Sequence, residues 1–145
     1  MSSAKLKFYQ KEATKTRLAD ATPYEIIQLL MLGAMDNLAL AKGAVQRKDF
    51  EIKSIALSKV NAIIHSLRSC LDFEVGAEIS ENLYALYSYM LEKLADASIA
   101  KDDTDAIDEV TALLREIKSA WDQIGPEAQR MMAEQSNSAG VVNAR

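Results

Sequence analysis

Apolar residues recur at steps of three and four in four successive stretches of this chain, and this spacing constrains the possible folds more than any other feature. A period of that length gathers the apolar side chains on one face of an α-helix. Two Pro and five Gly among 145 residues are too few for a protein made mostly of turns and strands. The sequence therefore predicts an all-α protein with helices over about residues 23–46, 50–71 and 77–99, and a last helix that Gly125-Pro126 ends.

Signals at the helix ends support these boundaries. Thr22, Pro23 and Glu25 have the spacing of a capping box, in which the Thr and Glu side chains satisfy free backbone N–H groups. Asp49 can cap the second helix, and aspartates between residues 102 and 108 stand at the positive end of the fourth helix. The loops are short, which forces neighbouring helices to be antiparallel. We therefore expect an antiparallel up-down four-helix bundle with a short N-terminal cap segment.

The two ends of the chain differ in character from its middle. Residues 1–21 are polar and charged with scattered apolar groups and are expected to form the cap segment, residues 22–125 the bundle, and residues 126–145 a largely disordered tail. The N-terminus turns polar too early for a signal peptide. The longest apolar run, from Ile26 to Met35, is far shorter than the roughly 20 residues of a membrane helix. We expect a soluble, cytoplasmic protein without membrane insertion.

The residue types needed for catalysis or metal binding are scarce. The single histidine, His65, is expected on the solvent side of its helix, and the single cysteine, Cys70, is expected as a small buried hydrophobic residue. One His and one Cys cannot build a structural zinc site, and Ala62 stands where a di-iron bundle needs Glu three residues before His. A net charge of −4 does not suit a nucleic-acid coat protein. The sequence thus predicts no catalytic residue, metal, cofactor or nucleic-acid partner, and no enzyme.

The first helix is apolar on more faces than a bundle helix needs. One stripe suffices for a core face, yet Leu29, Leu32 and Leu40 point broadly the other way, and the second helix shows small residues that would leave a shallow groove. Three explanations are open: the N-terminal segment covers this face, a second copy of the chain covers it, or an amphipathic helix of another protein lies there. The predicted core stripes comprise Ile27, Leu30, Met31, Ala34, Leu38, Ala41 and Val45 in the first helix, Ile79, Leu83, Leu86, Tyr87, Met90, Leu94 and Ala97 in the third, and Ile107, Val110, Leu114, Ile117, Trp121 and Ile124 in the fourth.

One stretch of the sequence resembles the signature of a known family. From Leu71 to Met90 the chain reads Leu-Asp-Phe-Glu-Val-Gly-Ala-Glu-Ile-Ser-Glu-Asn-Leu-Tyr-Ala-Leu-Tyr-Ser-Tyr-Met. The flagellin export chaperones, the FliS family, have a Leu-Asp, a Gly-Gly-Glu-Ile and an Asn-Leu-x-x-Leu-Tyr-x-Tyr-Met in that order. Further matches in the right order bring the resemblance to about residues 8–125; they are Tyr9-Gln10, Thr22-Pro23 and Ala120-Trp121.

The chain departs from this family pattern at two places. Met31-Leu32 stands where the family often has Tyr-Asp, and Gly76-Ala77 stands in place of Gly-Gly. The first change makes the outer side of the helix more apolar and removes any polar contact that the Tyr-Asp pair would make.

The resemblance implies a cytoplasmic helical bundle that binds the C-terminal segment of newly made flagellin. Covering that segment would block premature polymerisation and keep the subunit competent for flagellar type III export. Export-gate components and other flagellar regulators are further candidate partners, and the protein is expected to be a monomer or a weak homodimer. The alternative function is a homo-oligomeric helical adaptor or structural bundle that uses the same apolar face on itself.

The candidate partner-binding residues combine the wheel analysis with the resemblance. Phe8 and Tyr9 would cover the apolar surface until flagellin displaces them. Gly33 would let the partner helix approach closely, and Tyr89, which points away from the core stripe, would add an amphipathic ring to the interface. The apolar and rim positions complete the set, which is Phe8, Tyr9, Ile26, Leu29, Leu32, Gly33, Asp36, Leu40, Ile55, Lys59, Ala62 and Tyr89.

Overall fold

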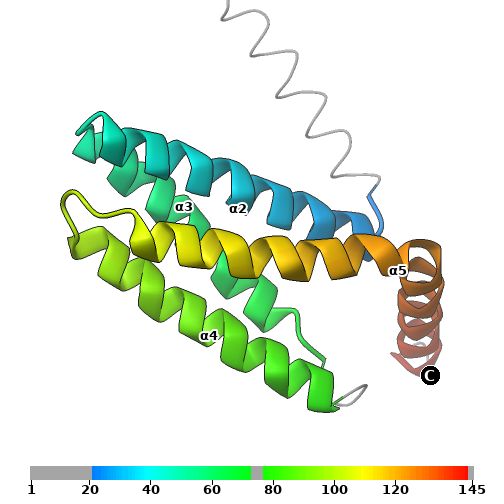
Figure 1. The fold of residues 1–145 in the computed structure, drawn as a ribbon. Coiled ribbons are helices and arrows are strands. Elements are labelled where there is room, and N and C mark those ends of the chain that lie inside the picture. Colours follow the sequence, from blue (N-terminus) through cyan, green and yellow to red (C-terminus); the bar gives the residue numbers. More distant parts are fainter. Residues whose placement is uncertain (1–20, 73–76, 144–145) are drawn as a thin grey trace, which may run out of the picture.

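Four helices form the part of the chain that the computed structural model describes, residues 21–72 and 77–143. In Figure 1 successive helices turn back at alternate ends of the bundle. Each packs on two neighbours, α2 and α4 both lying between α3 and α5, so α2 and α4 occupy diagonal corners. The prediction of an all-α four-helix fold is confirmed. The helices are α2 (Pro23–Gln46), α3 (Phe50–Ser69), α4 (Ala77–Ile99) and α5 (Asp105–Asn143).

Local capping chemistry sets the starts of the first two helices. The Thr22 hydroxyl accepts a hydrogen bond from the Glu25 backbone N–H at 3.2 Å, and Pro23 occupies the first helical turn. The Asp49 carboxylate accepts one from the backbone N–H of Ile52 at 3.2 Å. The tight connection before it places Lys48 at φ 59°, a left-handed conformation that reverses the chain within three residues. Both predicted caps are therefore present.

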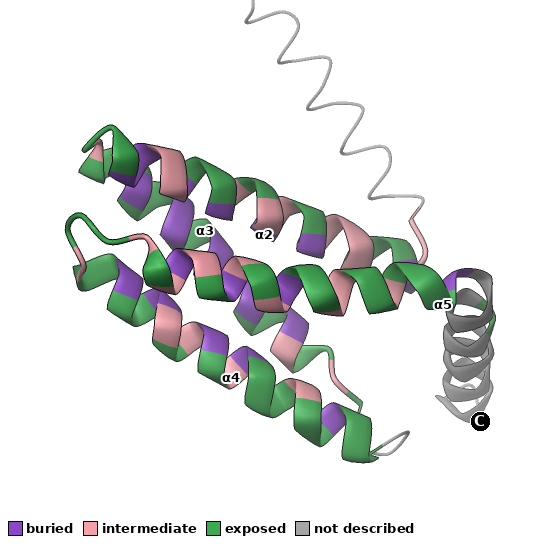
Figure 2. Cartoon of the chain, viewed as in Figure 1, coloured by how far each residue is buried: buried purple, intermediate pink, exposed green. Residues whose placement is uncertain are grey.

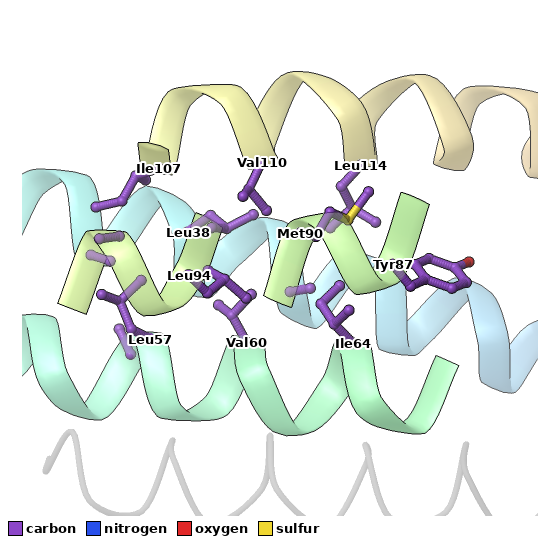
Figure 3. Close-up of a cluster of buried hydrophobic side chains, with 14 of the residues drawn as sticks. Leu38, Leu57, Val60, Ile64, Tyr87, Met90, Leu94, Ile107, Val110 and Leu114 are labelled. Atoms are coloured by element: carbon purple, nitrogen blue, oxygen red, sulfur yellow. The ribbon is translucent and has the colours of Figure 1, made fainter. Parts of the chain in front are cut away.

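All four helices contribute to one apolar core, shown in close-up in Figure 3. The predicted core stripe of α2 is buried or half-buried throughout. Tyr87 is buried among the aliphatic side chains, as predicted, and this burial raises the pKa of its hydroxyl to about 12. The largest fully buried side chains are Met31, Leu38, Val60, Ile64, Met90, Leu94, Ile107, Val110 and Leu114.

Four residues expected in the core are exposed instead. Leu86 lies about 100° of helix rotation from Tyr87, at the edge of the α4 core arc, and Ile79, which is 68% exposed, is in the first turn of α4. Ile124 directly precedes the bend at Gly125, where the bundle ends. Cys70 follows the last turn of α3 and is exposed, at the edge of a recess that it lines with residues of α2 and α4. Helical spacing identifies a face, but not where along its length the neighbouring helices stop.

Gly125 redirects α5 rather than ending it. Its backbone, at φ 31° and ψ −117°, is not helical, and the chain leaves the bundle at a steep angle in Figure 1. The helix then continues to Asn143, where the sequence predicts a largely disordered tail. Pro126 is suited to the first position of a new helical segment, and the sequence that follows, Glu-Ala-Gln-Arg-Met-Met-Ala-Glu, is rich in strong helix formers.

A paired aromatic contact joins the start of α2 to the end of the bundle part of α5. The rings of Tyr24 and Trp121 stack with centroids 5.0 Å apart and an interplanar angle of 18°. The Tyr24 hydroxyl donates to the Trp121 carbonyl at 2.8 Å, and the Trp121 indole N–H donates to the Tyr24 carbonyl at 3.3 Å. This reciprocal contact closes the bundle at the end where both terminal segments leave it.

Candidate partner-binding surface

The outer face of α2 is apolar although none of the other described helices covers it. Leu32 is 47% exposed, Leu40 is 46% exposed, Ile26 is also exposed, and Leu29 is half-buried. Figure 2 shows that exposed and buried positions alternate along α2. By length and composition α2 could even span a membrane, a test that a bundle's core helix also passes, yet only 22% of its most apolar 18-residue window is buried. The second apolar face predicted for this helix is therefore present and open to solvent.

The outer face of α3 continues this surface. Ile55 is 51% exposed, and Ala62 and Lys59 are exposed as well. Gly33 of α2 faces Ile63 of α3, since an added Cβ at Gly33 would lie 3.6 Å from Ile63 Cδ1. This contact shows which residues of the two helices lie at the same height along the bundle. The two helices run in opposite directions, so Leu40, seven residues after Gly33, is expected level with residue 56 of α3, seven residues before Ile63 and next to Ile55 in the sequence. Exposed apolar side chains of these two neighbouring helices therefore lie at similar levels along the bundle.

We call this the α2/α3 surface. Its polar edge carries Asp36 and Lys59, one from each helix and both exposed. Its apolar members come from positions that helical spacing places on the outer side of each helix. The surface comprises Ile26, Leu29, Leu32, Gly33, Asp36 and Leu40 of α2 with Ile52, Ile55, Lys59 and Ala62 of α3.

Gly33 sits at the centre of the α2/α3 surface and has a definite place in the packing. It is half-buried, and its missing side chain faces Ile63 at an ordinary van der Waals distance. Its carbonyl accepts a hydrogen bond from the Asn37 side-chain amide at 2.8 Å. A methyl group would fit at this position in the free protein, so the α2–α3 packing does not require glycine here.

One ion pair and one side-chain hydrogen bond join α2 to α5 near opposite ends of their contact. The Lys42 ammonium lies 2.8 Å from an Asp108 carboxylate oxygen. Hydrogen bonding from Lys42 holds the pKa of the Asp108 carboxyl below its usual range. At the other end, Lys118 and Gln28 both donate to Asp122 and lower the pKa of that carboxyl in the same way.

The structure does not bring Tyr89 together with the other candidate residues. Its hydroxyl donates to the Glu109 carboxylate of α5, and the Lys93 ammonium lies 5.5 Å from its ring centroid. Tyr89 therefore belongs to the α4/α5 seam, on the other side of the bundle from the α2/α3 surface. Phe8 and Tyr9 lie outside the described residues.

Two apolar members of the surrounding area are absent from the candidate set derived from the sequence. Ile52 is exposed in the first turn of α3, three residues before Ile55, and Ile63 contacts Gly33 from below. Ile52 and Ile55 share one side of the helix with Lys59 and Ala62, so a wheel extended to the first turn would have found Ile52. Ile63 has no such signal, because helical spacing places it on the predicted core stripe of this helix, with Val60, Ile64 and Leu67.

The chemistry of the described residues is that of a binding surface. Among residues 21–72 and 77–143, no three His, Cys, Asp or Glu side chains come together in a way that could hold a metal ion. His65 is exposed, as predicted, with its Nδ1 3.3 Å from an Arg68 guanidinium nitrogen. A four-helix bundle that exposes a continuous apolar surface is suited to binding another helix.

Comparison with known proteins identifies the family. The family model described as flagellar protein FliS matches residues 5–128 of the chain. The chain is 41% identical over 128 residues to the flagellar secretion chaperone FliS of Vibrio cholerae, covering 88% of this chain and 93% of that protein. It is 44% identical over 119 residues to the flagellar secretion chaperone FliSB of Pseudomonas aeruginosa, covering 82% and 94%. The Salmonella typhimurium flagellar secretion chaperone FliS is 38% identical over 124 residues, covering 85% and 91%.

The chain therefore belongs to the FliS family. This is a family of flagellar export chaperones and not of enzymes, which confirms the resemblance seen in the sequence and the prediction that the protein has no catalytic activity.

Proposed function

We propose that this protein is a cytoplasmic export chaperone that binds the C-terminal segment of flagellin along the α2/α3 surface. The bound segment would be an amphipathic helix whose apolar side packs on α2 and α3. In this state its apolar side cannot pack on another subunit, so the flagellin cannot polymerise before export. The segment would stay ready for unfolding and transfer through the flagellar type III apparatus.

The observation that carries this proposal is the exposed apolar face of α2, the helix that also supplies a large share of the core. Ile26, Leu32, Leu40 and Ile55 keep between a third and a half of their surface in solvent. Covering such half-exposed side chains contributes about 1 kcal/mol each. Ordering a disordered partner costs about 2–5 kcal/mol. The surface therefore supports binding only if the partner covers all of it, which favours a partner helix of several turns.

Met31 and Leu32, which stand where the family often has Tyr-Asp, have different places in the structure. Met31 is buried in the core, whereas Leu32 is on the α2/α3 surface. The replacement of the family's usual Asp by Leu32 therefore enlarges the apolar part of the surface, and Met31 acts in packing alone. We expect this protein to hold its partner with more apolar and less polar contact than relatives with Tyr-Asp.

The N-terminal segment has a place in this proposal. Phe8 and Tyr9 would rest on part of the α2/α3 surface in the free protein and leave it when flagellin binds. Deleting residues 1–18 would then strengthen or speed binding. Clearly weaker binding by the truncated protein would show that the segment contributes contacts to the bound partner instead.

Calorimetric titration tests the proposed function directly. The titrant is a peptide of the C-terminal ~40 residues of the flagellin from the same organism, and the expected result is one-to-one binding with a negative heat-capacity change. Absence of binding, with both components shown intact, would remove the proposal. Light scattering on the free protein tests the alternative, since a stable dimer at low concentration would mean that the α2/α3 surface serves self-association.

A further inference from the structure

A recess lies between the first turns of α3 and the last turns of α4. Its volume is about 420 Å³. Its walls are largely apolar, with Phe50 and Leu57 on one side and Ile99 on the other, and Ile99 is 81% exposed. The recess is separate from the α2/α3 surface, because it opens on the side of α3 that faces α4.

A buried lysine gives this recess its chemistry. Lys53 is only 4% exposed and lines the recess, and its ammonium donates to the carbonyl of Ala100 just beyond the end of α4. That contact caps the helix. An ammonium has three donors, and a single carbonyl takes one of them. Lys101 adds a second cation, and none of the described residues that line the recess is acidic.

Two positive groups beside an apolar wall favour a ligand with a carboxylate next to an apolar side chain. The C-terminal residue of a peptide has this form, because its main-chain carboxylate is attached to the same Cα as its side chain. In an internal Asp or Glu the carboxylate is at the end of the side chain itself. A different residue would then have to supply the apolar group that packs on the wall of the recess. The recess therefore fits a chain end better than an internal Asp or Glu.

The position of the recess connects it to the surface already described. Phe50 and Lys53 flank Ile52, which belongs to the α2/α3 surface, so both regions share the first turns of α3. A chain that follows the α2/α3 surface toward Leu40 and Ile55 needs only to cross the start of α3 to enter the recess.

We propose that this recess binds the C-terminal carboxylate of the partner, with Lys53 and Lys101 pairing with the charge and with an apolar side chain of one of the last two residues packing on Phe50, Leu57 and Ile99. The proposal rests on the proposed function, since it assumes that the bound segment is the end of the flagellin chain. It fixes the direction of the partner, whose last residues lie at the end of the bundle that holds the α2–α3 connection.

The test compares two forms of one peptide on the wild-type protein. A flagellin C-terminal peptide is titrated as the free acid and as the C-terminal amide, which differ only in the terminal charge. The amide is expected to bind about tenfold more weakly, because a hydrogen-bonded ion pair is lost. Equal affinities for the two forms would overturn the proposal and leave the proposed function standing. Failure of both forms to bind would overturn both.

Protein variants assign the effect to the recess. In Lys53→Met the acid and the amide should bind alike, while circular dichroism reports whether α4 keeps its end. Ile99→Ser gives an independent test that spares the buried lysine and should weaken both peptides severalfold. Ile79→Ser is the matched control, an exposed isoleucine at the other end of the same helix, and should leave binding unchanged. If binding is insensitive to Ile99→Ser, or if replacing an internal Asp or Glu of the peptide removes the dependence on Lys53, the recess does not hold the chain end.

Discussion

The half of the bundle formed by α2 and α3 and the half formed by α4 and α5 share one core but differ in what they show to solvent. Residues 22–72 carry five acidic and six basic side chains, whereas residues 77–125 carry eleven acidic and four basic ones. The first half is thus nearly neutral and exposes aliphatic side chains, and the second half is strongly acidic. The acidic charge therefore lies mainly on the α4/α5 half, and the exposed aliphatic side chains of α2 and α3 have few acidic neighbours along the chain.

Exposed apolar groups occur on both halves, and their surroundings separate them. Along the middle of α4 the exposed rings are engaged by charged neighbours. Tyr84 lies under the Arg68 guanidinium at 5.0 Å, and Tyr89 bonds Glu109 beneath Lys93. The aliphatic groups of the α2/α3 surface can make no such polar contact. An exposed aromatic ring is thus weaker evidence for a binding site than an exposed run of Leu and Ile, because the ring can be satisfied by its neighbours.

The largest expected effect is a loss of partner binding when a charge is placed on the α2/α3 surface. Leu32→Asp should weaken binding of the flagellin peptide by at least about thirtyfold, as expected for a central contact of an interface. Far-UV circular dichroism and thermal melting should change little, because Leu32 is half exposed. Leu86→Asp, an exposed leucine on α4, is the matched control and should bind normally. If both variants bind alike, the two faces do not differ in function.

Alkaline pH distinguishes the inner from the outer side of α4. The pKa of buried Tyr87 is raised to about 12, so the folded state holds this proton more tightly than the unfolded state. The stabilisation is complete below about pH 10 and is lost as the pH rises from there toward 12, by about 1.4 kcal/mol per pH unit. Urea unfolding between pH 9 and 12 measures this loss.

Two tyrosine variants provide the controls for that experiment. Tyr87→Phe should remove most of the alkaline loss, whereas Tyr89→Phe should remove little of it, because Tyr89 is exposed. Tyr89→Phe should also leave the peptide affinity unchanged. A drop in affinity would show that the partner reaches across to the α4/α5 side, as the sequence-based candidate set supposed.

Gly33→Ala separates folding from binding at the centre of the α2/α3 surface. Alanine favours a helix interior over glycine by about 1 kcal/mol, and the added methyl meets Ile63 at an acceptable distance. The free protein should therefore be slightly more stable in thermal melting. Weaker peptide binding by this more stable protein would place the partner's backbone against Gly33. Unchanged binding would remove Gly33 from the contact.

The smallest expected effect concerns the ion pair that holds α2 against the acidic half. Both Lys42 and Asp108 are nearly half exposed, so a double-mutant cycle with Lys42→Met and Asp108→Asn should give a coupling below about 0.5 kcal/mol. Because the Asp108 pKa is lowered, this contribution is present at neutral pH and is lost as the pH falls below about 4. A coupling above that value would make the pair a determinant of how α2 is oriented.

Local features of the fold could be predicted from the sequence because their causes are local. The caps at Thr22 and Asp49 depend on residues three positions away, and the two faces of α2 follow from spacing within one helix. The exposure of Cys70 and Ile124 was predicted wrongly, since both residues lie at the end of their helix's part of the bundle, where helical spacing no longer decides burial. The stacking of Tyr24 on Trp121 joins residues 97 positions apart, for which no local signal exists.

The sequence by itself determined four helices, the core stripe of α2 and the presence of a second apolar face on that helix, because helical periodicity and capping act within a few turns. Only the tertiary structure decided that α3 extends this face with Ile52 and Ile55, and that Tyr89 lies across the bundle. It alone placed Lys53 beside the end of α4. The packing of all four apolar stripes together decides which helices become neighbours. This packing is a property of the whole chain and not of any one segment.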